Sequence, residues 1–205
     1  MLKMKRFLAG LAIAAAFTLS FGQAFASGEG SGITPDEALK KLMGGNARFM
    51  KDDKEYISWG DVRRKELTKG QNPFAVILSC SDSRVPPEHV FDQELGDIFV
   101  VRVAGNVADS IELGSVEYAA EHLNVPLVMV LGHKKCGAVT AAVNSGGKAE
   151  GNIGAIVKKI APAVETAKKS GKEKDDLLNA SIDENARQTA RVLTEKSPIL
   201  KHLVE

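Results

Sequence analysis

The sequence predicts an α/β protein whose central, mostly parallel β-sheet is flanked by helices. Three short apolar runs, at residues 74–79, 98–104 and 126–132, have the continuous hydrophobicity of strands that are buried on both faces. A stretch with helical periodicity separates the second run from the third, and alternation of strands with helices favours parallel pairing. The 205 residues, of which 44% are hydrophobic, suffice for one compact domain with its own core.

Residues 1–26 have the features of an export signal. Three basic residues precede an alanine-rich apolar run, and Ala24-Phe25-Ala26 matches the small-x-small pattern of a cleavage site. A transmembrane anchor is the alternative, but the run is short and a polar, Gly-rich segment follows it. We therefore predict a cleavable signal peptide, no membrane attachment after cleavage, and a periplasmic or secreted location.

Removing this segment changes the sign of the formal charge. The whole chain carries +1, whereas without its three N-terminal basic residues it has 24 basic against 26 acidic residues, a charge near −2. Nucleic-acid-binding proteins carry a basic surface, so we expect no nucleic-acid partner.

The domain is expected to comprise residues 34–205, after a flexible linker of residues 27–33. It opens with an N-terminal helical arm, because Thr34 and Glu37 are spaced as a capping box in front of apolar residues at helical spacing. Gly44-Gly45 weakens the middle of this helix by about 1 kcal/mol per glycine.

The later helices are marked by caps and by apolar periodicity. Asp109 and Glu112 form a second capping box, in front of the helical stretch between the second and third apolar runs. Residues 155–170 and 183–196 each place apolar side chains on one face. Pro162 is expected to kink or divide the first of these two helices.

Potential metal ligands follow the first and third apolar runs. Cys80 comes directly after the first run, and His133 and Cys136 come after the third. The carboxyl ends of parallel strands meet at one edge of a sheet, where α/β enzymes place their chemistry. Two thiolates and an imidazole suit Zn²⁺, and three protein ligands leave a fourth position for water. We therefore predict one Zn²⁺ per chain.

Two further readings of these residues stay open on spacing alone. Asp82 and Arg84, just after Cys80, would ordinarily form a turn with a surface ion pair. In an exported protein, Cys80 and Cys136 would ordinarily form a disulfide, here in a non-catalytic domain. A disulfide requires neither the dyad nor His133, which favours the metal site.

Three motifs together resemble the β-class carbonic anhydrases. They are CSDSRVPPE (residues 80–88), GDIFVVRVAGN (96–106) and GHKKCGAV (132–139), and the similarity extends from residue 44 to residue 205. The resemblance implies an exported bacterial zinc enzyme, a carbonate dehydratase that converts carbon dioxide to bicarbonate and a proton through zinc-bound hydroxide. It also implies a homodimer or a homotetramer.

The same resemblance assigns roles to individual residues. The zinc ligands would be Cys80, His133 and Cys136. Asp82 and Arg84 would form the catalytic dyad, in which the arginine keeps the carboxylate off the metal through a bidentate pair. Four more positions would contact the substrate: Gln71, Phe99, Tyr118 and Gly137.

The chain departs from the family pattern in two places. Val103 stands where many relatives carry an asparagine, and the sequence stops at Glu205, where relatives continue into a further strand. Either the sequence is truncated at its C-terminus or one edge of the sheet is left uncovered. A second alternative keeps the zinc and the fold but takes carbonyl sulfide or carbon disulfide as the substrate.

Overall fold

The computed structural model describes residues 30–53, 60–171 and 173–205. The predicted signal peptide lies outside the described residues. The strands are β1 (Ala75–Ser79), β2 (Ile98–Arg102) and β3 (Val128–Leu131). The helices are α1 (Pro35–Lys51), α2 (Asp61–Leu67), α3 (Pro87–Val90), the 3₁₀ turn η1 (Ala104–Asn106), α4 (Ser110–Glu117), the π-helical turn η2 (Tyr118–His122), α5 (Gly137–Ser145), α6 (Ile153–Lys168), α7 (Lys174–Lys196) and α8 (Pro198–Val204). None of the helices in this part of the chain has the length and apolar composition needed to cross a membrane.

The three predicted strands form one parallel sheet in the order β2-β1-β3. Every residue of the central strand β1 is buried, as predicted. Strands β2 and β3 are partly exposed, because each pairs with β1 on one side only among the described residues. The prediction of burial on both faces therefore holds for β1 and is wrong for the two outer strands.

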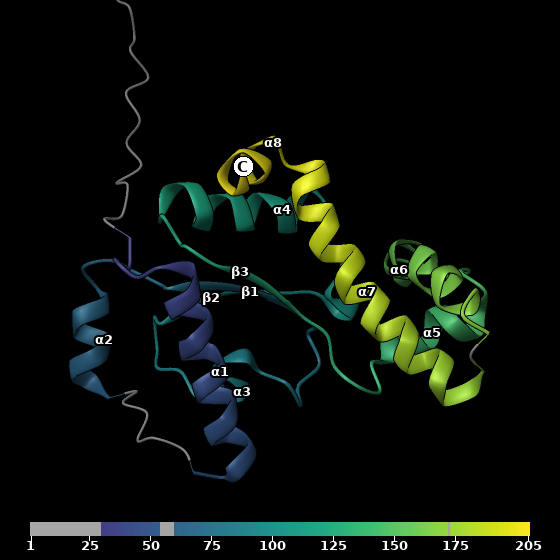
Figure 1. Cartoon of the computed structure of the whole chain (residues 1–205), viewed down its shortest axis with the longest axis horizontal. Helices are drawn as coiled ribbons and strands as arrows, with labels where there is room; N and C mark the ends of the chain where they lie inside the picture. The colour runs from purple at the N-terminus through teal and green to yellow at the C-terminus, as the bar shows by residue number, and fades with distance from the viewer. Residues whose placement is uncertain (1–29, 54–59, 172) are drawn as a thin grey trace, which may run out of the picture.

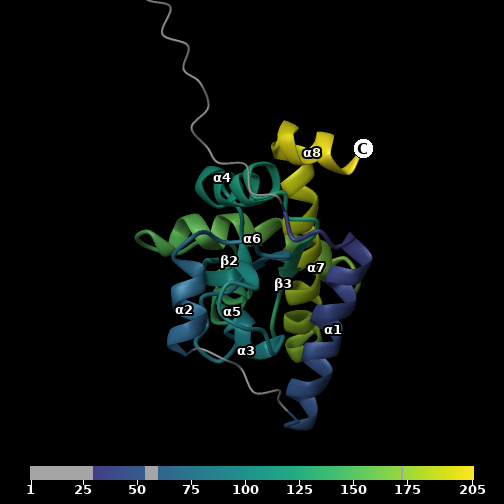
Figure 2. The same cartoon turned by 90° about the vertical axis from the view of Figure 1, so that its left-hand side faces the viewer.

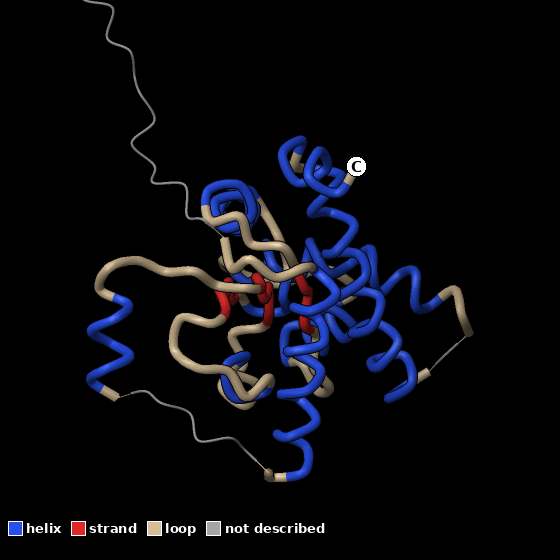
Figure 3. Tube along the Cα trace, turned by 60° about the vertical axis from the view of Figure 1, so that its left-hand side comes forward, coloured by secondary structure: helices blue, strands red, loops and turns tan. Residues whose placement is uncertain are grey.

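Helices cover both faces of the sheet (Figures 1 and 2). Successive side chains of β1 point to opposite faces, so each face presents apolar side chains for helices to cover. Val76 and Leu78 pack in one cluster with residues of α4, η2, α7 and α8. Ala75 and Ile77 pack in another, with Leu42 of α1. Figure 3 shows the strands at the centre, surrounded by helices. The predicted α/β class is confirmed.

Both predicted capping boxes are present. Glu37 Oε2 accepts a hydrogen bond from the Thr34 amide at 2.8 Å, and Glu112 Oε2 accepts one from the Asp109 amide at 3.0 Å. Each pair satisfies amides that the first turn of a helix leaves without partners, so α1 and α4 begin where their sequences indicate.

Pro162 lies inside α6, which runs as one helix from Ile153 to Lys168. Of the two predicted effects of Pro162, a kink or a division, division is therefore wrong. A proline inside a helix costs about 3 kcal/mol. Val157, Ile160 and Val164 on the same helix are fully or almost fully buried, and burial of each such side chain contributes about 1.5–3 kcal/mol. Packing therefore outweighs the local penalty.

Gly45 has a packing role that the sequence does not reveal. It lies where α1 crosses the end of α3, and a Cβ built on it would come within 1.7 Å of the Phe91 carbonyl oxygen. Beside it, Asn46 donates to the Val90 carbonyl and Arg48 donates to Asp92 at 2.6 Å. A glycine allows this close approach, which compensates for its low helix propensity.

The neighbouring glycines provide a matched pair of variants. Gly45→Ala should lower the free energy of unfolding by about 2 kcal/mol or more, because a backbone atom must shift to admit the methyl group. Gly44→Ala should raise it by up to about 1 kcal/mol, because only the end of the Arg48 side chain lies within 4 Å. Urea unfolding of both variants checks the pair, and equal effects would contradict this account of α1.

Candidate metal centre

The carboxyl end of the sheet brings the three predicted ligands together. Cys80 follows β1, His133 follows β3, and Cys136 is the N-cap of α5. The register pairs Ser79 with Leu131, so the two chain segments leave the sheet side by side. The ligand atoms of the three residues all lie within 4.8 Å of one another, and they form the one such metal-binding group found in the described residues.

The donor atoms of these residues fit a zinc ion. The two sulfur atoms are 4.0 Å apart, close to the roughly 3.8 Å expected for two thiolates on a tetrahedral Zn²⁺ with bonds of about 2.3 Å. His133 Nδ1 is 2.9 Å from the Lys134 carbonyl, which can only accept, so Nδ1 carries the proton. The lone pair is then on Nε2, which is buried and has no hydrogen-bond partner within the described ranges. A metal ligand is expected to have this arrangement.

The surroundings of the sulfur atoms favour a thiolate on Cys80. The Cys136 thiol and the Gly105 amide, 3.3 Å away, both donate to Cys80 Sγ and hold the pKa of Cys80 well below its ordinary value, at about 4. Without a metal the two sulfurs share one proton, which raises the pKa of Cys136. The amides of Val139 and Ala138, at the start of α5, favour the Cys136 thiolate once a cation displaces that proton.

Asp82 and Arg84 form the predicted pair beside the ligands. Arg84 donates to Asp82 through Nε at 2.8 Å and through Nη2 at 2.7 Å, which is the bidentate geometry. The Arg84 side chain, helped by its own amide, holds the pKa of Asp82 far below its usual range. Asp82 Oδ2 is 3.8 Å from His133 Nε2, so the carboxylate lies next to the ligand set without belonging to it.

Arg102 is a supporting residue that the sequence analysis missed. At the end of β2, it donates to the Cys80 carbonyl at 3.0 Å and to the Asp82 carbonyl at 2.6 Å. It therefore holds the backbone on both sides of Ser81. The sequence signal was Arg102 itself, a single charged residue within the second apolar run. The first apolar run, which pairs with it, is followed by Cys80 and Asp82.

The predicted substrate-binding residues lie in two places. Gly137 is the first residue of α5, next to Cys136. Phe99 and Tyr118 are together at the other end of the sheet, with ring centroids 6.2 Å apart, and Gln71 and Tyr118 line one cavity there, of about 760 Å³. Phe99 pairs with Val76 in the sheet. Val76 precedes Cys80 by four positions along the same chain, or about 13 Å of extended strand, and this distance separates the group from Cys80.

Comparison with known proteins assigns the family. A family model described as carbonic anhydrase matches residues 75–205. The chain is 41% identical to carbonic anhydrase 2 of Mycobacterium tuberculosis over 173 residues, which cover 83% of this chain and 82% of that protein. The chain belongs to the β-class carbonic anhydrases. It is also 44% identical to the carbonic anhydrase of Mycolicibacterium smegmatis, over 75% of this chain and 77% of that one.

Solved structures of the class have the same fold. The β-carbonic anhydrase CcaA matches with a TM-score of 0.65 and 27% identity, over 82% of this chain and 78% of that one. The enzyme CafA of Aspergillus fumigatus matches with a TM-score of 0.63 and 26% identity, over 82% and 79%. This carbonic anhydrase is therefore an enzyme of carbon dioxide hydration, and the non-catalytic alternative is wrong. Its cysteines are free, with sulfur atoms 4.0 Å apart, about twice the length of a disulfide bond.

Cys80→Ser should abolish metal binding. A serine hydroxyl does not ionise as the thiol does, and the remaining two ligands hold a divalent ion weakly. Metal analysis of the purified variant should find almost no zinc, against about one ion per wild-type chain. The exposed neighbour Ser81, changed to alanine, is the matched control and should keep its metal. A full complement of zinc in Cys80→Ser would remove Cys80 from the ligand set.

Proposed function

We propose that this carbonic anhydrase hydrates carbon dioxide at a single Zn²⁺ held by Cys80, His133 and Cys136. The main support is that three donor atoms from separate segments lie within 4.8 Å of one another, with the lone pair of His133 Nε2 left unused. When bound, Zn²⁺ would supply a Lewis acid that lowers the pKa of a coordinated water, to about 7 in open sites, and so provides hydroxide. Bicarbonate and a proton are the products.

Asp82 would orient the attacking oxygen, and Arg84 would orient Asp82. Asp82 Oδ1 accepts hydrogen bonds from the backbone amide and Nε of Arg84. Oδ2 accepts one from Nη2 and lies toward His133. A carboxylate oxygen accepts more than one hydrogen bond, so Oδ2 would keep the capacity to accept one from the attacking water or hydroxide. The bidentate pair would also hold Asp82 away from the ligand group of Cys80, His133 and Cys136.

We further propose that a second copy of the chain completes the substrate pocket. Gln71, Phe99 and Tyr118 lie at the opposite end of the sheet from the ligands of their own chain, so they approach a metal only across an interface between copies. A two-fold dimer would bring this group of each chain to the metal of its partner. Gln71 would then donate to a substrate oxygen, and the two rings would form an apolar wall.

We also propose that the protein is exported to the periplasm or secreted. It is supported by the basic and apolar residues of the first 26 positions and by the Ala24-Phe25-Ala26 pattern.

Carbon dioxide hydration by the purified mature protein should depend on zinc and should rise with pH. Activity is expected to increase from about pH 6.5 to about pH 9, because the two thiolates donate charge to the metal and so weaken its effect on bound water. Stopped-flow assays with a pH indicator, on samples of known zinc content, measure both dependences. Full activity in zinc-free protein would overturn the assignment.

Asp82→Asn should retain zinc and slow hydration by about 10²-fold or more, because the neutral amide loses the charged pair that orients it. Metal analysis and stopped-flow rates on the same sample separate the two effects. Loss of zinc together with activity would instead make Asp82 a structural support of the ligands. An unchanged rate would exclude it from the reaction.

Heterodimers of two defective chains should recover activity. One chain carries Cys80→Ser and the other carries Gln71→Ala, with different affinity tags, so that mixed dimers are isolated. If Gln71 serves the partner's metal, one of the two sites in each mixed dimer is intact, and about half of the wild-type activity returns. If Gln71 serves its own chain, activity stays below that of the Gln71→Ala homodimer.

A further inference from the structure

Asn185, in the middle of α7, is linked to the candidate metal centre by two hydrogen bonds that both involve Gly105. Its side chain is fully buried, and Nδ2 donates to the Gly105 carbonyl at 2.7 Å, across 80 positions of sequence. The amide of the same Gly105 donates to Cys80 Sγ at 3.3 Å. A single residue, Gly105, therefore connects Asn185 to Cys80 of the candidate ligand group.

We propose that Asn185 is a positioning residue of the metal centre, which holds Gly105 so that its amide is directed at the Cys80 sulfur. The inference rests on the proposed metal site. Asn185 acts on the ligand through the Gly105 backbone and touches neither the metal position nor the substrate.

Gly105 needs such an anchor because of its conformation. It has φ +74° and ψ 16°, the left-handed region that glycine enters without strain. A Cβ at this position would lie 2.7 Å from Ile160 Cδ1 and 3.0 Å from Ala138 Cβ, so only glycine fits between α5 and α6. Glycine also rotates most freely, and the direction of its amide is therefore set by what holds the adjoining peptide.

The amide of Asn185 is not explained by stability alone. Its Oδ1 is buried and has no hydrogen-bond partner in the described part of the chain. A buried polar atom without a partner lowers stability by about 1–3 kcal/mol, and an aliphatic side chain would avoid this cost. The side-chain amide is thus costly, and its one hydrogen bond within the described residues goes to the Gly105 carbonyl.

Helix α7 is well placed to act as the support. Ala186 Cβ would lie 3.4 Å from a Cβ built on Gly132, the residue before His133, so α7 packs closely against the second ligand segment as well. One turn beyond Asn185, Gln188 donates to the Lys159 carbonyl of α6 at 2.9 Å. Lys159 in turn pairs with Asp109 at 3.0 Å.

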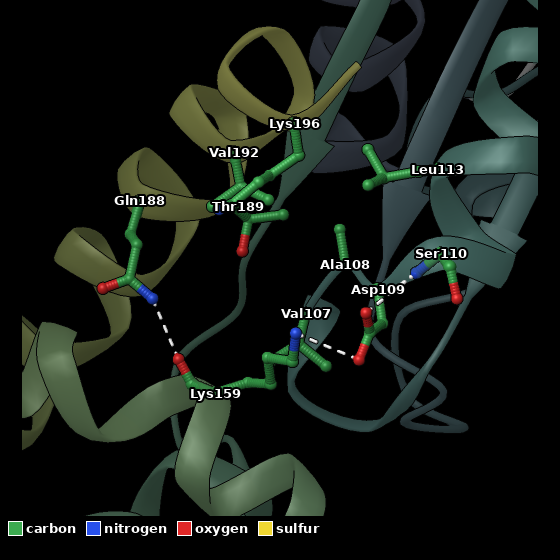
Figure 4. A pocket seen from close by; sticks show the side chains of 10 residues that line it. All are labelled: Val107, Ala108, Asp109, Ser110, Leu113, Lys159, Gln188, Thr189, Val192 and Lys196. Carbon is green, nitrogen blue, oxygen red and sulfur yellow. Dashed lines mark hydrogen bonds and ion pairs between the residues drawn. The ribbon is translucent and has the colours of Figure 1, made fainter.

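Figure 4 shows Asp109, Lys159 and Gln188 around a cavity between α7, α6 and the start of α4. The volume of this cavity is about 390 Å³. The segment that lines it at residues 107–110 continues directly from η1, which contains Gly105. The segment that follows Gly105 therefore lines the same cavity as the helix that carries Asn185.

The test compares Asn185→Leu with Gln188→Leu. Both variants lose a side-chain amide of α7 that donates to a backbone carbonyl, but only Asn185 is joined to Cys80. The first readout is the rate of zinc loss to an excess of chelator, and the second is the thiolate-to-metal absorption of the Co²⁺-substituted protein. Thermal unfolding of the metal-free proteins reports the structural effect separately.

We expect Asn185→Leu to bind zinc, to lose it about tenfold or more faster than the wild type, and to show altered Co²⁺–thiolate absorption. Gln188→Leu should match the wild type in both metal readouts, even if its thermal stability falls further. Asn185→Asp, which keeps the shape but not the donor, should also lose zinc faster.

Wild-type rates and spectra in Asn185→Leu, or equal changes in Gln188→Leu, would overturn the inference. If neither Asn185 variant folds, the residue serves the fold instead, and the inference also fails. Absence of zinc and Co²⁺ binding by the wild-type protein would refute the proposed function itself, so the two failures are distinguishable.

Discussion

Two thiols and an imidazole, buried within 4.8 Å of one another, set the main constraint on this structure. Cys80 and Cys136 are 5% and 1% exposed, and His133 Nε2 has no protein partner among the described residues. Groups of this kind lower stability unless a hydrogen bond or a cation compensates for lost water. A cation that joins all three satisfies them together, which makes metal binding and local order parts of one equilibrium.

The surrounding polar residues support this group from several directions. Arg102 holds the backbone around Cys80, Arg84 holds Asp82, and the Gly105 amide faces the Cys80 sulfur. Each contact is a hydrogen bond to a charged or ionisable group or to the chain that carries it, so each limits motion without adding a ligand.

The two ends of the sheet have different chemistry. Thiols, an imidazole and the Asp82–Arg84 pair are at the carboxyl end, whereas Gln71, Phe99 and Tyr118 are at the amino end. The strand length between the two groups exceeds the reach of any side chain, so in the proposed dimer each group would serve a different pocket. This separation explains why assembly and activity are linked in the proposed function.

The sequence alone determined the class of the fold and the candidate ligand group. Continuous apolar runs specify the strands, and the capping boxes at Thr34 and Asp109 specify helix starts. Cys80, His133 and Cys136 follow strand ends. Each of these signals depends on near neighbours in the chain. Only the tertiary structure decided that Gly45 admits the Phe91 carbonyl and that α6 passes through Pro162. It also decided that Arg102 donates to the Cys80 carbonyl, that Asn185 donates to the Gly105 carbonyl, and that Gln71 lies far from Cys80. These features arise from contacts between segments many residues apart, whose geometry local patterns do not encode.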